Sequence, residues 1–240
     1  MAVSRREFLV DAAAVAVAVG VTGRSLAGQA KAPLKIGVIG SGRQGGALGL
    51  QWAKAGHEIF FSSRHPETLK DLVAQAGPKA KAGLPDEAVK FADVVLIAVP
   101  YGVLPQVGKD YAPLMKGKVV IDVCNPRVDR DGDVGKDALA RGTGVTSKEY
   151  LPGVRLVRAL NALSFVQVTK EANRAGEKLG IPIASDDQGA IAIAVRLVED
   201  AGFDPVVVGG LARAKEFDAG TPVYVKGLTA AQLKVALKLP

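Results

Sequence analysis

Short apolar runs alternate along the chain with segments in which apolar residues recur at helical spacing. An apolar run that stops at glycine or polar residues is typical of a buried strand, and the helical spacing is typical of a covering helix. Strands are predicted at residues 34–39, 57–61, 79–83, 94–99, 119–123, 155–160, 181–184 and 205–208. Helices are predicted at residues 45–55, 66–76, 85–91, 101–114 and 188–201, with a break in the fourth at Pro105. The alternation predicts βαβ units around a mainly parallel sheet, with ligands at the carboxyl ends of its strands.

The two ends of the chain depart from this pattern. Residues 4–9 read Ser-Arg-Arg-Glu-Phe-Leu, and an Ala/Val-rich run at 12–21 and small residues at 25–30 follow them. This order is typical of a twin-arginine export signal, and the run is shorter than the roughly 20 apolar residues of a membrane span. We therefore predict that residues 1–30 are a signal read by the Tat export machinery, and that the protein folds in the cytoplasm and reaches the periplasm or the exterior. The alternative is a disordered or helical extension.

The carboxyl-terminal residues 211–240 form a small extension. Residues 217–224 are typical of a loop, and residues 229–237 of a capped amphipathic helix. Such a segment can close a pocket or pack on another subunit, so both a monomer and a homodimer stay open.

One glycine-rich string lies where the predicted sheet would bind a ligand. Gly40-Ser41-Gly42-Arg43-Gln44-Gly45 follows the first strand and opens the first helix. In a dinucleotide-binding loop, the first glycine permits the turn, the second lets backbone approach a pyrophosphate, and the third lets helix and strand pack closely. The helix amino terminus then attracts the phosphates. We predict an α/β fold with a Rossmann-type, doubly wound domain at residues 34–210.

The residues after the second strand indicate which dinucleotide binds. An NAD site usually has a carboxylate there for the ribose 2′-hydroxyl. This chain instead has Ser62, Ser63 and Arg64. A serine can donate to a 2′-phosphate and an arginine can pair with it. We therefore predict NADP rather than NAD.

Composition narrows the function classes. The formal net charge is +7, with basic residues scattered and aromatic residues at 5%, so a nucleic-acid partner is not indicated. Cys124 is the single cysteine, and His57 and His65 have no acidic cluster beside them, so no metal site is predicted. No catalytic acid–base set is found. Asp122 is expected to be structural, Tyr101 to pack against the cofactor, and Cys124 to be buried and inert.

The chain resembles the NADPH-dependent coenzyme F420 reductases. It is also similar to the NADPH-binding half of STEAP-type metalloreductases and, more distantly, to pyrroline-5-carboxylate reductase. The resemblance covers most of residues 34–210. It rests on residues 35–42, 53–58, 62–67, 121–126 (Ile-Asp-Val-Cys-Asn-Pro), 158–163 (Arg-Ala-Leu-Asn-Ala-Leu) and 202–205. Two features depart from that family: the twin-arginine leader, and a polar segment at 170–178 that we expect to be a long helix.

The resemblance implies roles for individual residues. It places the pyrophosphate on Ser41, Gly42, Arg43 and Gln44, and the 2′-phosphate on Ser63 and Arg64. The residues implied to border the ribose, the nicotinamide and its hydride partner are Val99, Pro100, Val103, Asn125, Asn161 and Ala162.

The implied function is hydride transfer between NADP(H) and a small-molecule redox carrier, with the deazaflavin coenzyme F420 as the first candidate. Such a transfer needs two aligned rings rather than an acid or base. A flavin or ferric chelate is the next candidate, and a non-catalytic exported NADP-binding module is the alternative of another class. An imine or small carbonyl reductase would need a proton donor near the nicotinamide, and the sequence reveals none.

Overall fold

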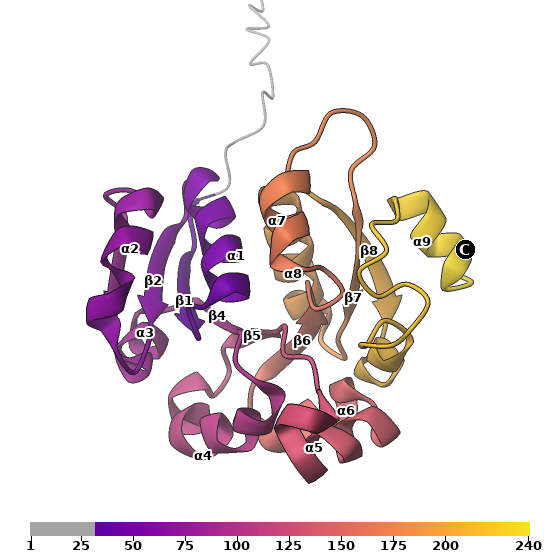
Figure 1. The fold of residues 1–240 in the computed structure, drawn as a ribbon, viewed down its shortest axis with the longest axis horizontal. Coiled ribbons are helices and arrows are strands. Elements are labelled where there is room, and N and C mark those ends of the chain that lie inside the picture. The colour runs from indigo at the N-terminus through magenta and orange to yellow at the C-terminus, as the bar shows by residue number, and fades with distance from the viewer. Residues whose placement is uncertain (1–31) are drawn as a thin grey trace, which may run out of the picture. The chain divides into compact units, whose positions relative to one another are not determined.

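A computed structural model describes residues 32–240, of which 33–240 form one compact unit. The export signal predicted for residues 1–30 lies outside the described residues. The described part contains an eight-stranded sheet in the order β3-β2-β1-β4-β5-β6-β7-β8 (Figure 1). Its strands are β1 (Lys35–Ile39), β2 (Glu58–Ser62), β3 (Ala80–Gly83), β4 (Val94–Ile97), β5 (Val119–Asp122), β6 (Arg155–Ala159), β7 (Gly180–Ala184) and β8 (Asp204–Gly209).

The first six strands are parallel and follow the 3-2-1-4-5-6 order of a dinucleotide-binding sheet. Ile36 of β1 lies opposite Ile59 of β2 on one side and Val94 of β4 on the other. β7 then pairs antiparallel with β6, and β8 runs parallel to β7. The predicted Rossmann-type, doubly wound and mainly parallel α/β fold is confirmed.

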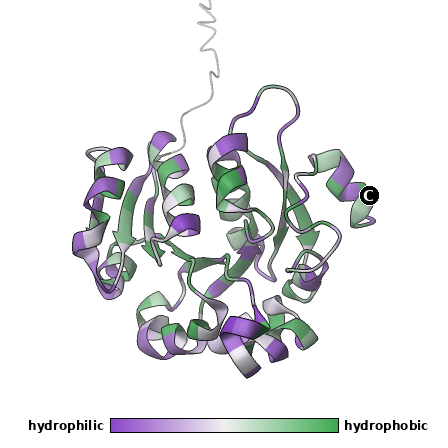
Figure 2. Cartoon of the chain, in the orientation of Figure 1, coloured by the Kyte–Doolittle hydropathy of each residue, from purple (hydrophilic) through white to green (hydrophobic). Residues whose placement is uncertain are grey.

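Helices cover both faces of the sheet. One face carries α1 (Arg43–Lys54), α2 (Lys70–Ala76), α7 (Phe165–Glu171) and α8 (Gln188–Asp200). The other carries α3 (Pro85–Phe91), α4 (Leu104–Met115), α5 (Val128–Arg141) and α6 (Thr143–Tyr150). The remaining helical elements are η1 (Pro66–Leu69), η2 (Tyr101–Val103), η3 (Leu211–Glu216) and α9 (Ala230–Ala236). Residues of high hydropathy lie along the strands and on parts of the helices, whereas hydrophilic residues lie mainly on the helices and loops (Figure 2). No helix within 32–240 has the length and apolar character of a membrane span.

Helix α1 is fixed to the sheet by both packing and hydrogen bonds. Trp52 is fully buried, and its Nε1 donates to the carbonyl oxygen of Leu197 in α8 at 2.7 Å. Gln51 Nε2 donates to the carbonyl oxygen of Val168 in α7 at 3.3 Å. Because these polar groups are paired inside the core, α1 presents its amino terminus in one fixed position.

Two predicted helices differ from those observed. Pro105 does not break a helix but lies in the first turn of α4, where an N–H has no intrahelical partner to lose. Residues 170–178 do not form a long helix, because α7 begins at the Ser164 capping box and ends at Glu171. Asn173 then takes a positive φ of 56°, and its N–H donates to the Gly202 carbonyl oxygen. Those backbone groups bond across the fold instead of along a helix.

The carboxyl-terminal extension matches its prediction in part. Residues 217–225 form turns and bends, and Thr229 caps α9, since its hydroxyl accepts from Gln232 N–H. The short helix η3 was not predicted. Phe217, Val223 and Leu233 pack with Val206 and Val208 of β8, so the extension covers the end of the sheet.

A buried ion network joins this extension to the middle of the sheet. Arg158 of β6 is fully buried and lies 2.8 Å from Asp122 Oδ2 and 3.3 Å from Asp218 Oδ1. Its Nη1 also donates to the carbonyl oxygens of Asp122 and Cys124. Asp218 in turn accepts from the N–H and hydroxyl of Thr143 in α6 at 3.0 and 2.5 Å. One guanidinium therefore ties two strands, a helix and the extension together.

Removing this guanidinium should destabilise the protein strongly. Arg158→Ala leaves Asp122 and Asp218 buried without their cation, and we expect the free energy of unfolding to fall by about 3–5 kcal/mol. Urea unfolding followed by circular dichroism measures the change. Arg155→Ala is the matched control, because Arg155 lies on the same strand and its pair with Asp187 is partly exposed. Equal losses for the two variants would contradict the assignment.

Candidate functional site

The glycine loop joins β1 to α1 and uses its three glycines differently. Gly40 has a φ of +92°, which favours glycine, and a Cβ there would meet the carbonyl of Ala98. A Cβ on Gly45 would clash with the carbonyl oxygen of Gly40. Gly42 has an ordinary φ of −76°, and a Cβ there would find no protein atom within 4 Å. The fold requires the first and third glycines, whereas the second leaves open space in front of the helix.

That open space lies before the amino terminus of α1. Gly42 is its N-cap, no side chain caps the helix, and its first turn contains no acidic residue. The first backbone N–H groups of a helix lack intrahelical partners and carry a partial positive charge. This geometry suits a phosphate group.

Two side chains predicted to hold the pyrophosphate make other contacts. Gln44 Nε2 donates to the carbonyl oxygens of Leu160 and Leu163, both at 3.2 Å. The Arg43 guanidinium lies 5.3 Å from the centre of the Phe165 ring. Gln44 therefore fixes the turn after β6 to α1, and its side-chain amide donors are taken by these two carbonyl oxygens.

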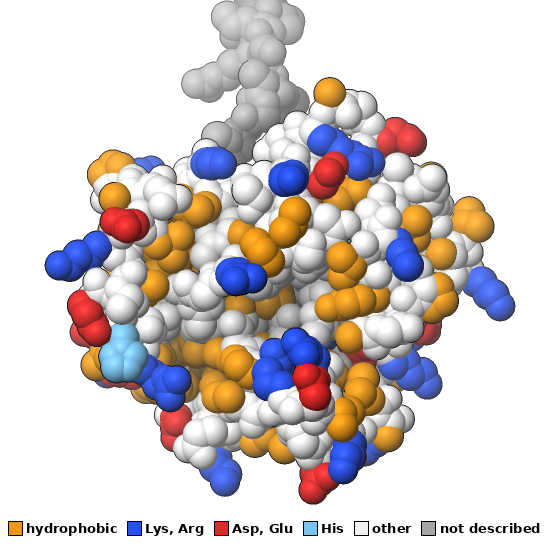
Figure 3. All heavy atoms as spheres, viewed as in Figure 1, with side chains coloured by type: hydrophobic (Ala, Val, Ile, Leu, Met, Phe, Trp, Pro, Cys, Tyr) orange, Lys and Arg blue, Asp and Glu red, His pale blue; other side chains and the backbone are white. Residues whose placement is uncertain are grey.

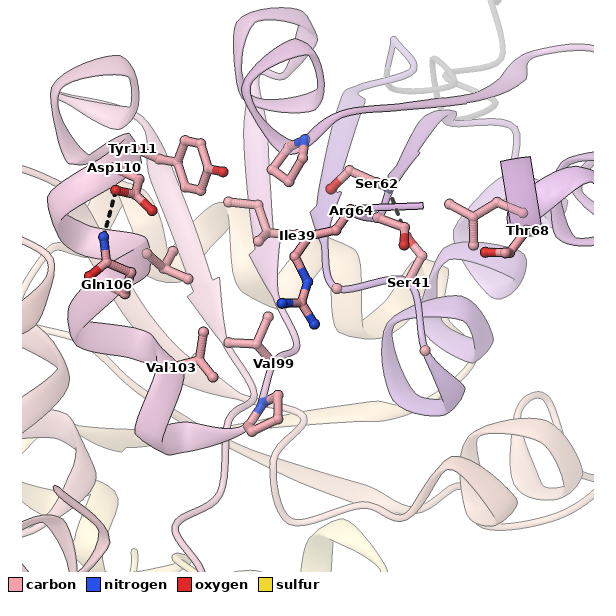
Figure 4. A pocket seen from close by; sticks show the side chains of 17 residues that line it. Ile39, Ser41, Ser62, Arg64, Thr68, Val99, Val103, Gln106, Asp110 and Tyr111 are labelled. Atoms are coloured by element: carbon pink, nitrogen blue, oxygen red, sulfur yellow. Dashed lines mark hydrogen bonds between the residues drawn. The ribbon is translucent and has the colours of Figure 1, made fainter. Parts of the chain in front are cut away.

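A cavity of about 560 Å³ extends from the loop along the ends of β1, β2 and β4 (Figure 4). Nine of the predicted site residues line it: Gly40, Ser41, Gly42, Ser62, Ser63, Arg64, Val99, Pro100 and Val103. The other lining residues are Ile39, Thr68, Leu69, Pro85, Gln106, Val107, Asp110 and Tyr111. In Figure 3 the face is hollowed near its centre, where apolar side chains lie between basic ones. The cavity is large enough for part of a dinucleotide.

Of the three polar residues at the end of β2, one has its side chain bonded within the fold and two have side-chain donors that could bind a ligand. Ser62 is fully buried; its hydroxyl donates to the Val38 carbonyl oxygen and its N–H donates to Ser41 Oγ. Ser63 Oγ accepts from the N–H of His65, which leaves the hydroxyl proton free to donate. Arg64 is exposed and projects into the cavity, and its guanidinium makes no ion pair within residues 32–240 (Figure 4). Ser63 and Arg64 are thus the groups free to bind an anion.

Asn125 and Asn161, predicted near the nicotinamide, come together at the ends of β5 and β6. Asn125 Nδ2 donates to the Asn161 carbonyl oxygen at 2.8 Å, and Asn161 Nδ2 donates to Asn125 Oδ1 at 3.3 Å. Neither these residues nor Ala162 line the cavity itself. Asn161 and Ala162 are buried, so Asn125 is the partly exposed member of this group.

The carboxyl-terminal extension reaches the same group. Asn161 Nδ2 also donates to the Phe217 carbonyl oxygen, and the N–H of Val225 donates to the Ala162 carbonyl oxygen at 2.9 Å. Tyr224 is thereby placed beside the ends of the strands, which sequence spacing did not indicate. Burial raises the pKa of its phenol, while the guanidiniums of Arg127 and Arg130 lower it.

The structure also shows where Tyr101, Asp122 and Cys124 lie, to which the sequence analysis gave roles. Tyr101 does not pack against the cavity; it is fully buried, and its hydroxyl bonds to Thr146 Oγ1 and Ser147 Oγ. Asp122 is structural as expected, since it pairs with Arg158 and accepts from the N–H of Cys124. Burial raises the pKa of the Cys124 thiol well above its usual value, which agrees with a buried, inert cysteine. No cluster that could hold a metal occurs within the described residues.

Half of the eight lining residues that the sequence analysis missed lie on one face of α4: Gln106, Val107, Asp110 and Tyr111. Together with the predicted Val103, which directly precedes α4, they follow the i, i+3, i+4, i+7, i+8 spacing of a helix stripe. Because α4 follows β4, whose end borders the predicted ligand, the spacing of this stripe could have indicated from the sequence that these residues line the site.

Comparison with known proteins agrees with the geometry. Residues 35–126 match the family model described as NADP oxidoreductase, coenzyme F420-dependent. The chain is 26% identical over 212 residues to the F420-dependent NADP reductase of Methanothermobacter marburgensis, covering 80% of this chain and 91% of the reductase. It is 28% identical over 205 residues to rat metalloreductase STEAP3, covering 81% of this chain and 38% of that protein. This chain therefore spans well under half the length of STEAP3.

A solved structure of a hypothetical protein, SMa0349 of Sinorhizobium meliloti, superposes with a TM-score of 0.71 at 24% identity. The match covers 82% of this chain and 95% of that one. At this identity the likeness supports the fold, and the glycine loop lies in the part matched by the family model.

The two glycine positions give a direct test of the site. Gly45→Ala should lower the free energy of unfolding by about 1–3 kcal/mol because its methyl group meets backbone. Gly42→Ala should cost about 1 kcal/mol or less but lower the affinity for a dinucleotide about tenfold, because its methyl group fills the open space. Urea unfolding and calorimetric titration with NADPH separate the two effects. Unchanged NADPH affinity in Gly42→Ala would contradict this placement.

Proposed function

We propose that the protein is an NADP-dependent oxidoreductase that transfers hydride between NADP(H) and a second redox carrier. The observation that carries the proposal is the cavity between an uncapped helix amino terminus and Arg64, a cation without an ion-pair partner in the described chain. No carboxylate follows β2 at the position where an NAD site uses one. An open helix amino terminus and a cation without an ion-pair partner, both lining one cavity, suit a pyrophosphate and a 2′-phosphate.

The residues fit such a cofactor. The α1 amino terminus and the backbone of Ser41 and Gly42 would hold the pyrophosphate, and Ser63 and Arg64 the 2′-phosphate. When bound, NADPH supplies the hydride. Val99 and Pro100 would border the ribose, and Asn125, anchored to Asn161, would border the nicotinamide. The protein's contribution is to align the ring and exclude water.

Coenzyme F420 is the first candidate for the second carrier. The family model and the archaeal relative are both described as F420-dependent, and the relative is matched over nearly its whole length. Residues 32–240 contain no group of side chains that could hold a metal ion. The similarity to a metalloreductase keeps a ferric chelate in view as the alternative. The alternative of another class is an NADP-binding module without turnover.

Steady-state oxidation of NADPH with separate acceptors tests the function. We expect turnover with oxidised F420 and little with FMN or ferric citrate, read as loss of NADPH absorbance. Turnover with ferric citrate alone would favour the chelate reductase. Tight NADPH binding without turnover of any acceptor would overturn the oxidoreductase proposal and leave the binding module.

The choice of cofactor gives a second test. Arg64→Ala should weaken NADPH binding about tenfold to a hundredfold, as expected for loss of a charge-assisted hydrogen bond, and weaken NADH binding much less, because NADH has no 2′-phosphate for Arg64 to bind. Lys136→Ala is the matched control, because Lys136 is an exposed cation of α5 outside the cavity. Titration with both nucleotides gives the ratio of affinities. An equal loss for NADPH and NADH would contradict the assignment of Arg64 to the 2′-phosphate.

A further inference from the structure

The cavity contains an acidic residue that phosphate binding does not explain. Asp110 and Gln106 lie one turn apart on α4 and both line the cavity. Gln106 Nε2 donates to Asp110 Oδ1 at 2.7 Å, which orients the carboxylate. Figure 4 shows this pair across the cavity from Arg64. Asp110 makes no ion pair with any residue between 32 and 240, so Oδ2 is left to accept from a ligand.

A carboxylate beside an anionic cofactor is unfavourable unless it meets a hydrogen-bond donor. An ionised carboxylate accepts hydrogen bonds and cannot donate them. The ring edges of a purine mostly present nitrogen acceptors, which Asp110 would repel. Adenine has one donor group at position 6, its exocyclic amine. Hypoxanthine carries a carbonyl oxygen at position 6 instead, and its nearest donor is the N–H of the neighbouring ring position, N1.

The chemistry of the cofactor brings the base to this end of the cavity. The 2′-phosphate and the base are attached to neighbouring carbons of one ribose. If Ser63 and Arg64 hold the phosphate, the base lies within reach of the α4 stripe. Val103, Val107 and Pro85 provide apolar surface for one ring face, and the Arg64 guanidinium can stack on the other. Asp110 and Gln106 then lie at the edge of the base.

We propose that Asp110, oriented by Gln106, recognises the 6-amino group of the adenine and so selects adenine over hypoxanthine dinucleotides. The inference rests on the proposed NADP function and adds a determinant of base specificity on α4. Asp110 Oδ2 accepts a hydrogen bond from the amine, whereas the carbonyl oxygen of a hypoxanthine would face it as a second acceptor. Asp110 is exposed at the rim, so water keeps the preference moderate.

Binding of two nucleotides to the full chain tests the proposal. The probes are NADPH and reduced nicotinamide hypoxanthine dinucleotide phosphate, each titrated calorimetrically. We expect the wild-type chain to bind NADPH about tenfold more tightly, in line with one hydrogen bond to a charged group. Asp110→Asn should bring the ratio close to one, because an amide can donate to the carbonyl oxygen. Gln106→Ala should give an intermediate ratio, because the carboxylate loses its orienting partner.

Asp133→Asn is the matched control, since it removes one exposed carboxylate of α5 outside the cavity and should keep the wild-type ratio. Circular dichroism confirms that each variant is folded. If the wild-type chain binds both nucleotides equally, or Asp110→Asn keeps the wild-type ratio, base recognition by Asp110 is wrong while the NADP function stands. If the wild-type chain binds neither nucleotide, both proposals are wrong.

Discussion

The pairing of Arg158 with two buried carboxylates holds the candidate site together. Arg158 lies on β6, Asp122 on β5 and Asp218 in the carboxyl-terminal extension, and all three are buried. Burial lowers the pKa of the guanidinium, but the Asp122 and Asp218 carboxylates raise it by more than burial lowers it. The pKa therefore lies above its usual value, and the arginine stays charged. Asp122 Oδ2 and Arg158 Nε still lack an aligned hydrogen bond among the described residues. Removing one partner of such a network is costly because it leaves buried charge without compensation.

That arrangement sets the geometry on both sides of the sheet ends. Arg158 donates to the carbonyl oxygen of Cys124, the residue before Asn125. Asn125 in turn donates to the carbonyl oxygen of Asn161, which lies in the turn after β6. Gln44 then ties the turn after β6 to the first turn of α1. A continuous set of hydrogen bonds therefore links the network to the helix that faces the phosphates. Small displacements there would misalign a bound ring, which is costly for hydride transfer.

The sequence predicted the parts of the structure that depend on local pattern. Apolar strands, capped helices and the glycine loop each have a signature within a few residues, and the parallel sheet followed from the alternation of strands and helices. Ser63 and Arg64 were found because their position after β2 is fixed by the fold. The features that the sequence did not reveal depend on partners far along the chain. Gln44 lies in the loop where a phosphate ligand is expected, yet its side-chain amide donates to carbonyl oxygens more than a hundred residues away. Helices α5 and α6 were not predicted, and α5 carries a glycine, Gly132, with a positive φ of 55° that interrupts its pattern.

The antiparallel pairing of β7 with β6 affects the order in which the contacts at the ends of the strands can form. Residues 217–225 then return to the ends of the strands. There the Phe217 carbonyl oxygen accepts from Asn161, and the Val225 N–H donates to Ala162. During synthesis the strands β1–β6 emerge first and can pair, but Arg158 then has one of its two carboxylates. The strands around the glycine loop can therefore pair early, whereas the bonds that hold Asn161 and Ala162 form only after residues 217–225 have been made.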